Sequence, residues 1–216
     1  DVMVSITKEG YAKRSSLRSY SASKEDQIEI KETDRLIYSG QLNTHDHLLI
    51  VTNKGNMIYR PVHELADKRW KEVGEHFSLT ITSLESGENI VGVFPYHEIA
   101  PNKQFVFVTK EGMIKRTAMN EFDVWRTYKS RPTLCIKLKT ETDEIISAEL
   151  VEGSANLDVL LITHLAFGLY YDLEEVPVVG ARASGVISIN LKNDDYVVSG
   201  MILNRGEDAT LTIVTQ

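Results

Sequence analysis

The chain has 216 residues, of which 42% are hydrophobic and 25% charged, and its net charge at neutral pH is −7. These proportions are typical of a folded globular protein, and the length suffices to bury a sizeable core. No apolar run reaches the roughly 20 residues of a membrane-spanning helix, and the amino terminus has no signal-peptide pattern. The single cysteine, Cys135, cannot form a disulfide within the chain, so we expect a reducing, cytoplasmic compartment.

One string of residues recurs four times along the chain and begins a fifth time. Its copies superpose without a gap over 1–23, 46–68, 103–125 and 157–179, and the aligned threonines, 45 to 57 residues apart, are Thr7, Thr52, Thr109, Thr163 and Thr215. Self-similarity at this period is typical of propellers and other repeat arrays, because one unit cannot bury its apolar face alone. We expect a single domain over 1–216, cut from a longer protein. The predicted repeats are about 1–45, 46–102, 103–156 and 157–208, with the start of a fifth at 209–216.

Each copy begins with a predicted hairpin. Its first strand is apolar on both faces, as expected for a short strand buried between neighbouring sheets, and the four first strands are 2–6, 48–51, 105–108 and 159–162. A glycine then stands where a hairpin turn favours a positive φ, at Gly10, Gly55 and Gly112. After the second strand come pairs of apolar residues that we interpret as loop anchors: Leu17 and Tyr20, Val62 and Leu65, Met119 and Phe122, Leu173 and Val176.

A second half-unit follows each hairpin. Further strands are predicted at 27–30, 78–81, 134–137 and 186–189, and closing strands at 35–40, 89–94, 144–150 and 196–202. This makes about four strands per repeat, the size of a propeller blade. We therefore predict an all-β, propeller-like fold of four blades with the apolar first strands near the axis, and a leftover strand of the fifth copy at 209–215.

Charge alternates with the repeat. Residues 8–18, 54–71 and 110–131 each carry a net charge of +3, whereas 24–46, 72–103 and 132–158 carry −3, −4 and −4. In a propeller these clusters would form a positive arc, which suits a phosphate backbone. The alternative interpretation is that these basic residues are merely solvated at the hairpin tips and bind nothing. The candidate DNA contacts are Lys13, Arg14, Arg18, Lys54, Arg60, Lys68, Arg69, Lys71, Lys115, Arg116, Arg126, Lys129, Arg131 and Arg182.

The fourth copy departs from this pattern. It has Ala166 in place of the turn glycine and Leu169-Tyr170 in place of the Lys-Arg pair, and residues 164–182 carry a net charge of −2. We expect DNA to leave the disc before this blade. Alternatively, its apolar residues Leu165, Phe167 and Tyr170 pack on another domain or another protein chain.

Signals for independent chemistry are weak. His45-Asp46-His47 has ligand-like spacing but no visible third ligand, and the acid pairs Glu174-Glu175 and Asp194-Asp195 are typical of solvated turns. We expect no catalytic group, metal or cofactor in this domain. The aromatic residues that could stack on bases are predicted to be core residues or loop anchors instead: Tyr20, Tyr59, Trp70, Trp125 and Tyr128.

The repeated pattern Val-x-Val/Ile-Thr-Lys-Glu-Gly-x-x-Lys-Arg-Ser/Thr resembles the carboxy-terminal domain of the A subunits of bacterial type IIA topoisomerases, over the whole chain. Segments 52–65 and 180–186 are most similar to the A subunit of topoisomerase IV (ParC). The resemblance implies a β-pinwheel, a propeller-like disc whose blades exchange strands, which binds and bends duplex DNA around a basic rim. Gyrase A subunits carry a glycine-rich basic box after the first blade, whereas residues 21–27 here contain no glycine and one base. A weakened version stands at 180–185.

The resemblance implies a non-catalytic tail that holds duplex DNA for relaxation, decatenation and chromosome segregation. The partners it implies are the rest of the homodimeric ParC chain and the ParE chain, in the nucleoid-containing bacterial cytoplasm. Mg²⁺ and ATP would serve the whole enzyme, an ATP-dependent topoisomerase, and not this domain. A gyrase-type domain that wraps DNA, or a protein-binding propeller without DNA affinity, are the alternatives.

Overall fold

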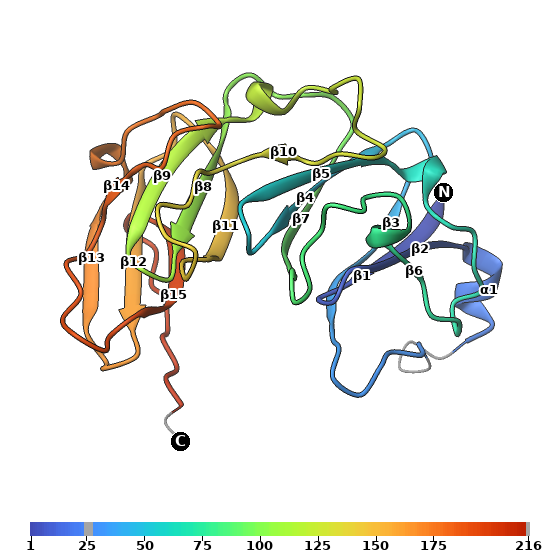
Figure 1. The fold of residues 1–216 in the computed structure, drawn as a ribbon, viewed down its shortest axis with the longest axis horizontal. Helices are drawn as coiled ribbons and strands as arrows, with labels where there is room; N and C mark the ends of the chain where they lie inside the picture. The colour runs from blue at the N-terminus through green and yellow to red at the C-terminus, as the bar shows by residue number, and fades with distance from the viewer. Residues whose placement is uncertain (24–27, 215–216) are drawn as a thin grey trace.

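The computed structural model describes residues 1–23 and 28–214, in which four small antiparallel sheets follow one another along an arc (Figure 1). Each repeat supplies three strands to its own sheet, or blade. These are β1 (Val2–Thr7), β2 (Tyr11–Ser16) and β3 (Leu36–Leu42); β4 (His47–Thr52), β5 (Asn56–Pro61) and β7 (Ile90–Tyr96); β8 (Lys103–Thr109), β9 (Met113–Ala118) and β11 (Ile145–Glu152); and β12 (Leu157–Thr163), β13 (Gly168–Asp172) and β15 (Val197–Asn204).

The fourth strand of a blade comes from the next repeat. β6 (Glu75–His76) pairs with β2 of blade 1, β10 (Thr133–Leu134) with β5 of blade 2, and β14 (Val186–Ile187) with β9 of blade 3. Blade 4 has three strands among the described residues, in the order β13-β12-β15. This exchange ties successive blades together, and the predicted all-β, propeller-like fold is confirmed.

The closing strands lie innermost. β3 contacts β7, β7 contacts β11 and β11 contacts β15, so these four line the inner side of the arc (Figure 1). The apolar first strands were predicted near the axis; β1, β4, β8 and β12 are each second in their sheets, next to the innermost closing strands. Their apolar character reflects burial between blades rather than closeness to the axis.

The first strands of the two middle blades, β4 and β8, each contribute to two cores, as predicted, whereas β1 and β12 each contribute to one. Leu48 and Ile50 face the core between blades 1 and 2, whereas Leu49 and Val51 face the core between blades 2 and 3. All four side chains are fully buried. Because side chains alternate between the faces of a strand, a strand with a core on both sides must be apolar throughout.

The hairpin turns have the predicted backbone. Gly10, Gly55 and Gly112 have φ values of +100°, +84° and +91°. In the fourth copy Ala166 adopts the same left-handed conformation, with φ of +65°. The turn geometry is therefore retained where the glycine is lost.

Short helices follow the second strands, and the predicted anchors lie within them or directly after them. These are α1 (Leu17–Ser21), η2 (Val62–Glu64), η4 (Met119–Phe122) and η5 (Leu173–Glu175). The anchors after β5, β9 and β13 are buried, whereas Leu17 and Tyr20 of α1 are half-buried.

Several predicted strands are shorter or absent. In place of strand 78–81 the chain forms β6 and the 3₁₀ helix η3 (Phe77–Leu79), because Phe77 and Ile81 turn into the first core. Residues 28–30 form no strand, and Glu29 donates its N–H to the Lys71 carbonyl. Residues 24–27 lie outside the described residues; they include Gln27 of the predicted strand and most of the segment 21–27 that was compared with the gyrase box. Residues 209–214 are irregular where a strand was predicted, and Thr215 lies outside the described part.

Candidate nucleic-acid interface

Three loops carry the chain from one blade to the outer edge of the preceding one. We call segments 66–74, 123–132 and 177–185 exchange loops 1, 2 and 3; they lead to β6, β10 and β14. The exchanged strand is the outermost of its blade, since the closing strand is innermost. The exchange loops therefore belong to the rim of the arc.

Exchange loop 1 is fastened by a buried lysine of the preceding repeat. Lys13 on β2 is only 1% exposed, and its Nζ donates to the carbonyl oxygens of Trp70 at 2.5 Å, Arg69 at 3.4 Å and Glu72. Burial lowers the pKa of the Lys13 ammonium to about 8, against the opposing effect of Glu72. The three carbonyls take up the hydrogen-bonding capacity of the ammonium.

The other two exchange loops have the same fastening. Lys115 is fully buried, and its Nζ donates to Gly180 O at 2.9 Å and Ala181 O at 3.1 Å in loop 3; burial lowers its pKa to about 8. In blade 2 the equivalent of Lys13 is Ile58, and Arg60, two residues further along the same strand face, replaces it. Its guanidinium donates to Tyr128 O at 2.9 Å and Lys129 O at 3.0 Å.

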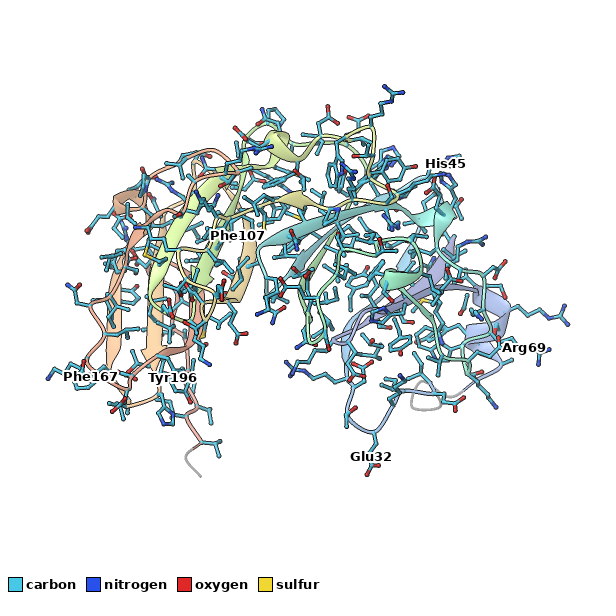
Figure 2. All side chains as sticks on the ribbon, viewed as in Figure 1. Glu32, His45, Arg69, Phe107, Phe167 and Tyr196 are labelled. Atoms are coloured by element: carbon cyan, nitrogen blue, oxygen red, sulfur yellow. The ribbon has the colours of Figure 1, made fainter. Side chains whose placement is uncertain are left out.

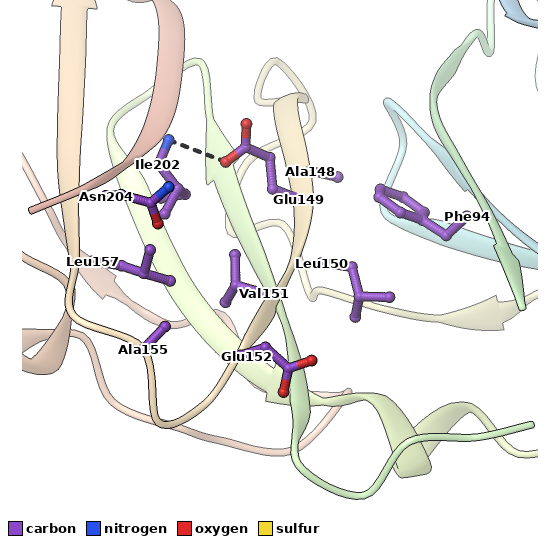
Figure 3. A pocket seen from close by; sticks show the side chains of 10 residues that line it. All are labelled: Phe94, Ala148, Glu149, Leu150, Val151, Glu152, Ala155, Leu157, Ile202 and Asn204. Atoms are coloured by element: carbon purple, nitrogen blue, oxygen red, sulfur yellow. Dashed lines mark hydrogen bonds between the residues drawn. The ribbon is translucent and has the colours of Figure 1, made fainter. Parts of the chain in front are cut away.

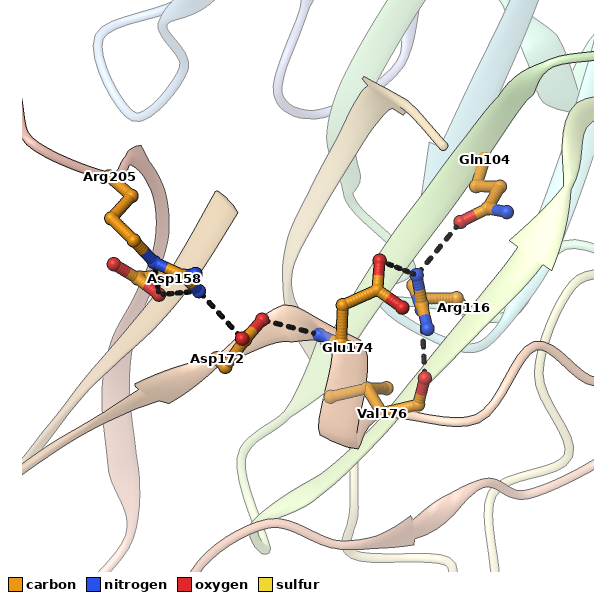
Figure 4. A network of polar contacts seen from close by, with 7 residues as sticks. All are labelled: Gln104, Arg116, Asp158, Asp172, Glu174, Val176 and Arg205. Carbon is orange, nitrogen blue, oxygen red and sulfur yellow. Dashed lines mark hydrogen bonds and ion pairs between the residues drawn. The ribbon is translucent and has the colours of Figure 1, made fainter. Parts of the chain in front are cut away.

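The arginines beside the two lysines hold the start of the same segments. Arg14 Nε donates to Leu65 O at 3.1 Å, and Arg116 Nε donates to Val176 O at 2.8 Å. Figure 4 shows the Arg116 guanidinium enclosed by Gln104, Val176 and Glu174, with 3.8 Å between Nη1 and the Glu174 carboxylate. Arg14 is more open, with an ion pair to Asp67 at 3.4 Å.

The structure thus separates the sequence-predicted contacts into two groups. Lys13, Arg60, Lys115 and Arg116 are 0–7% exposed and bound to protein oxygens, which leaves little of each side chain accessible to phosphate. Direct contact of these four residues with DNA stays a prediction. The sequence analysis did not predict that these cations bind loop carbonyls. The feature that could have indicated it is a cation on the second strand of a hairpin whose first strand is buried on both faces.

Most of the remaining predicted bases lie on the exchange loops or on α1 beside exchange loop 1. Arg18 lies on α1, which the structure brings to exchange loop 1 through the Trp70 N–H to Ser19 Oγ bond of 3.0 Å. Figure 2 labels Arg69, at the outer side of blade 1. Lys54, in the β4–β5 turn, is half-buried at the other end of β5 from Arg60. The exposed bases of the loops are Lys68, Arg69 and Lys71; Arg126, Lys129 and Arg131; and Arg182.

The number of exposed bases falls along the arc, from three in each of loops 1 and 2 to one in loop 3. Within loop 2, Lys129 is 3.3 Å from the Glu64 carboxylate, an exposed pair of little net energy. In blade 4, two aspartates form ion pairs with an arginine of the same repeat. Arg205 lies 2.9 Å from Asp158 and 2.7 Å from Asp172 (Figure 4). This ion pair and the Tyr170 hydroxyl hold the pKa of Asp158 below its usual range.

The aromatic side chains are structural, as predicted. Trp70 is fully buried against Tyr20, with ring centroids 4.9 Å apart, and Tyr59 is 3% exposed and packs edge-on against Tyr128. The Trp125 indole N–H donates to the Arg131 carbonyl at 2.8 Å, so this ring supports exchange loop 2.

The Asp and His residues of the 45–47 segment form hydrogen bonds with neighbouring side chains. Asp46 accepts from His97 Nδ1 at 3.0 Å, and His47 Nδ1 is 2.7 Å from the Tyr59 hydroxyl. Within residues 1–23 and 28–214, no group of three or more His, Cys, Asp or Glu side chains could hold a metal ion. None of the helices in this part of the chain has the length and apolar character to cross a membrane.

A pocket of about 480 Å³ opens between β11 and β15, near Phe94 of β7 (Figure 3). Its lining is mostly apolar, with two carboxylates, Glu149 and Glu152. Glu149 accepts the N–H of Ile202 at 3.0 Å, and burial raises the pKa of its carboxyl group. The pocket therefore joins two blades and does not assemble a set of convergent catalytic groups.

The family model that describes the DNA gyrase C-terminal domain, a β-propeller, matches residues 1–25, 46–96, 103–152 and 157–204. The A subunit of DNA topoisomerase 4 from Streptococcus pneumoniae is 44% identical over 212 residues, and that from Bacillus subtilis is 44% identical over 211. Each alignment covers 98% of this chain and 25% of the relative, so the chain spans about a quarter of these relatives' length.

Solved structures agree. A crystal structure of the C-terminal domain of DNA topoisomerase IV matches with a TM-score of 0.85 and 42% identity, over 94% of this chain and 61% of that one. The E. coli ParC C-terminal domain matches with a TM-score of 0.72 over 94% of this chain and 79% of that one; at 14% identity it shows the fold alone. The chain therefore belongs to the β-propeller family of DNA gyrase C-terminal domains, as a C-terminal domain of the kind found in the A subunits of topoisomerase IV.

Proposed function

We propose that this domain binds duplex DNA along its rim, through exchange loops 1 and 2 together with Arg18 of α1. The observation that carries the proposal is the location of the exposed bases. Once the buried cations are set aside, six exposed bases remain on two neighbouring exchange loops. Lysine and arginine on phosphates position a duplex without reading its sequence. Binding should therefore be sensitive to salt and largely independent of sequence.

The activity of the whole protein is part of the same proposal. Its relatives are named as components of a DNA topoisomerase. We infer that this domain holds a duplex for relaxation and decatenation, while cleavage and ATP hydrolysis belong to other parts of the enzyme. The inferred partners are the rest of the ParC-type chain and a ParE-type chain, with Mg²⁺ and ATP serving the whole enzyme in the bacterial cytoplasm.

A matched pair of triple variants tests the DNA contacts. Replacing Lys68, Arg69 and Lys71 by alanine removes three bases from exchange loop 1. The control replaces Lys31, Lys139 and Lys192, three exposed lysines beside hairpin turns, which changes the net charge equally. In a mobility-shift titration at several salt concentrations, the loop variant should lower the salt slope by up to about 3, at about 0.9 per lost phosphate contact. Equal slopes for the two variants would contradict the proposal.

Wrapping of DNA in the manner of gyrase is the first alternative. The segment after Tyr20 lacks the glycines of the gyrase box, which favours holding over wrapping. Ligation of a nicked circular plasmid in the presence of the domain separates the two. We expect no shift in linking number, whereas a wrapping domain would leave one.

A protein-binding role is the second alternative, and one observation favours it. Leu165, Phe167 and Tyr170, which are close in sequence on blade 4, are 49%, 50% and 57% exposed, and patches of exposed apolar side chains are typical of contact surfaces. The two roles use different blades, so one protein can have both.

A further inference from the structure

The buried cations contact the exchange loops at the residues that carry the exposed bases. Lys13 binds the carbonyls of Arg69, Trp70 and Glu72, which bracket Lys71. The pattern repeats in blade 3, where Lys115 binds the carbonyls of Gly180 and Ala181, directly before Arg182. Trp70 and Ala181 are equivalent, each 18 residues after the aligned threonine of its repeat.

These contacts fix which way the loop side chains point. In exchange loop 1, Trp70 is buried against Tyr20 while its neighbours Arg69 and Lys71 are exposed. With the carbonyls drawn inward by Lys13 and the indole packed beneath them, the two basic side chains are directed to solvent. A neutral side chain at position 13 would leave these carbonyls without their donor, and buried carbonyls without a donor turn toward water or cost free energy.

We propose that Lys13, Arg60 and Lys115 are positioning residues for DNA binding, each orienting the DNA-contacting loop of the following repeat. The inference rests on the proposed function of the rim. It means that every contact surface is built from two repeats, with the exposed bases supplied by one and their orientation by the other. The basic cluster at Lys13 then acts on DNA through exchange loop 1 and without touching phosphate.

The chain supplies its own matched control. Lys13 and Lys115 are both buried, both have a pKa lowered to about 8, and both bind loop carbonyls, three for Lys13 and two for Lys115. However, Lys13 orients a loop with three exposed bases and Lys115 a loop with one. A role confined to fold stability predicts equal losses for the two methionine variants. A positioning role predicts unequal ones.

The experiment measures duplex affinity and salt slope for Lys13→Met, Lys115→Met, Arg69→Ala/Lys71→Ala, and the combination of Lys13→Met with the last. We expect Lys13→Met to lower the slope by about 2 and the affinity at about 0.1 M salt by roughly tenfold or more, and Lys115→Met to lower the slope by at most about 1. In the Arg69→Ala/Lys71→Ala background, Lys13→Met should add almost nothing, because coupled sites are not additive.

Circular dichroism confirms that each variant is folded. If Lys13→Met does not fold, Lys13→Gln, which keeps one donor group, replaces it in the same cycle with a smaller expected loss. Equal slopes for the Lys13 and Lys115 variants, or full additivity in the cycle, would overturn the positioning role. The proposed function fails separately, on Arg69→Ala/Lys71→Ala alone, if that variant binds DNA like the unmodified chain; the positioning role then fails with it.

Discussion

The Nζ atom of Lys13 lies 2.5 Å from the carbonyl oxygen of Trp70, which is 57 residues further along the chain. This contact joins the second strand of one repeat to the exchange loop of the next. Its counterpart in blade 3, from Lys115 to Ala181, spans 66 residues at 3.1 Å. A cation buried in this way costs desolvation energy, and the cost is visible as a lowered pKa.

Stability should therefore depend on pH through these lysines. Burial lowers the pKa of Lys13 to about 8 in the folded chain, from 10.5 in the unfolded one. Between these values the unfolded state holds more protons, so the free energy of unfolding rises with pH, by up to about 3 kcal/mol for this group. The gain is complete above pH 10.5 and is lost as the pH falls through 8.

Urea denaturation at pH 8, 9 and 10 checks this, with Lys13→Met as the reference. The free energy of unfolding of the unmodified chain minus that of the variant should increase with pH, since the other titrating groups are common to both. A difference that stays constant over this range would show that the pKa of Lys13 is not lowered.

The turn glycines should differ in their tolerance of a side chain. At Gly55 an added Cβ would lie 2.6 Å from the backbone oxygen of Ile136, in the chain that follows β10, and at Gly112 it would lie 2.8 Å from that of Ile189. Both residues also have positive φ. We expect alanine at either position to cost about 3 kcal/mol of unfolding free energy, from backbone strain and overpacking together.

Gly87 is the control for this series, because it has a φ of +78° and no atom of the described residues lies within 4 Å of an added Cβ. Alanine there should cost only the backbone term, about 1 kcal/mol. Thermal denaturation of the three variants gives the comparison. Equal costs at positions 55 and 87 would mean that the exchanged segment does not pass close to the turn.

The thiol of Cys135 should be unreactive in the folded chain. It is fully buried, and burial raises its pKa to about 12, so almost no thiolate is present at pH 8. We expect iodoacetamide to leave it unmodified at this pH and to alkylate it completely in denaturant. Because Cys135 N–H binds the carbonyl of Gly55, the alkylation rate also reports detachment of the exchanged segment from blade 2. Rapid alkylation without denaturant would show that this segment opens readily.

The sequence predicted the fold but did not show which of the candidate bases are buried, for a physical reason. The repeat, the two-faced first strands and the turn glycines are local signals, and local geometry fixes them. Whether a lysine points outward depends on which segment packs over it. Lys13 and Lys68 both stand next to an arginine in a basic segment of the sequence. Lys13 is nevertheless buried, because a loop from the next repeat covers it, whereas Lys68 is exposed. Ala166 shows the opposite: the residue type departs from the glycine of the other turns, but the backbone keeps the positive φ of those turns.

The fourth blade provides the last prediction, on where the DNA path ends. Loop 3 has one exposed base, and the exposed acids Glu174 and Glu175 stand at its start. Phosphates following the rim from blades 1 and 2 would meet repulsion here. Replacing Glu175 by lysine should therefore tighten DNA binding or lengthen the bound footprint; adding Glu174→Lys should extend the effect, although it also removes the ion pair with Arg116.

Tyr170→Ala is the matched change on the same blade. It removes an exposed aromatic ring and the hydroxyl that donates to Asp158, but alters no charge on the rim, so DNA affinity should stay the same. Hydroxyl-radical footprinting on a duplex long enough to pass all four blades measures both variants. A footprint of the unmodified chain that already covers blade 4 would show that the path of the DNA is not set by the exposed bases of the exchange loops.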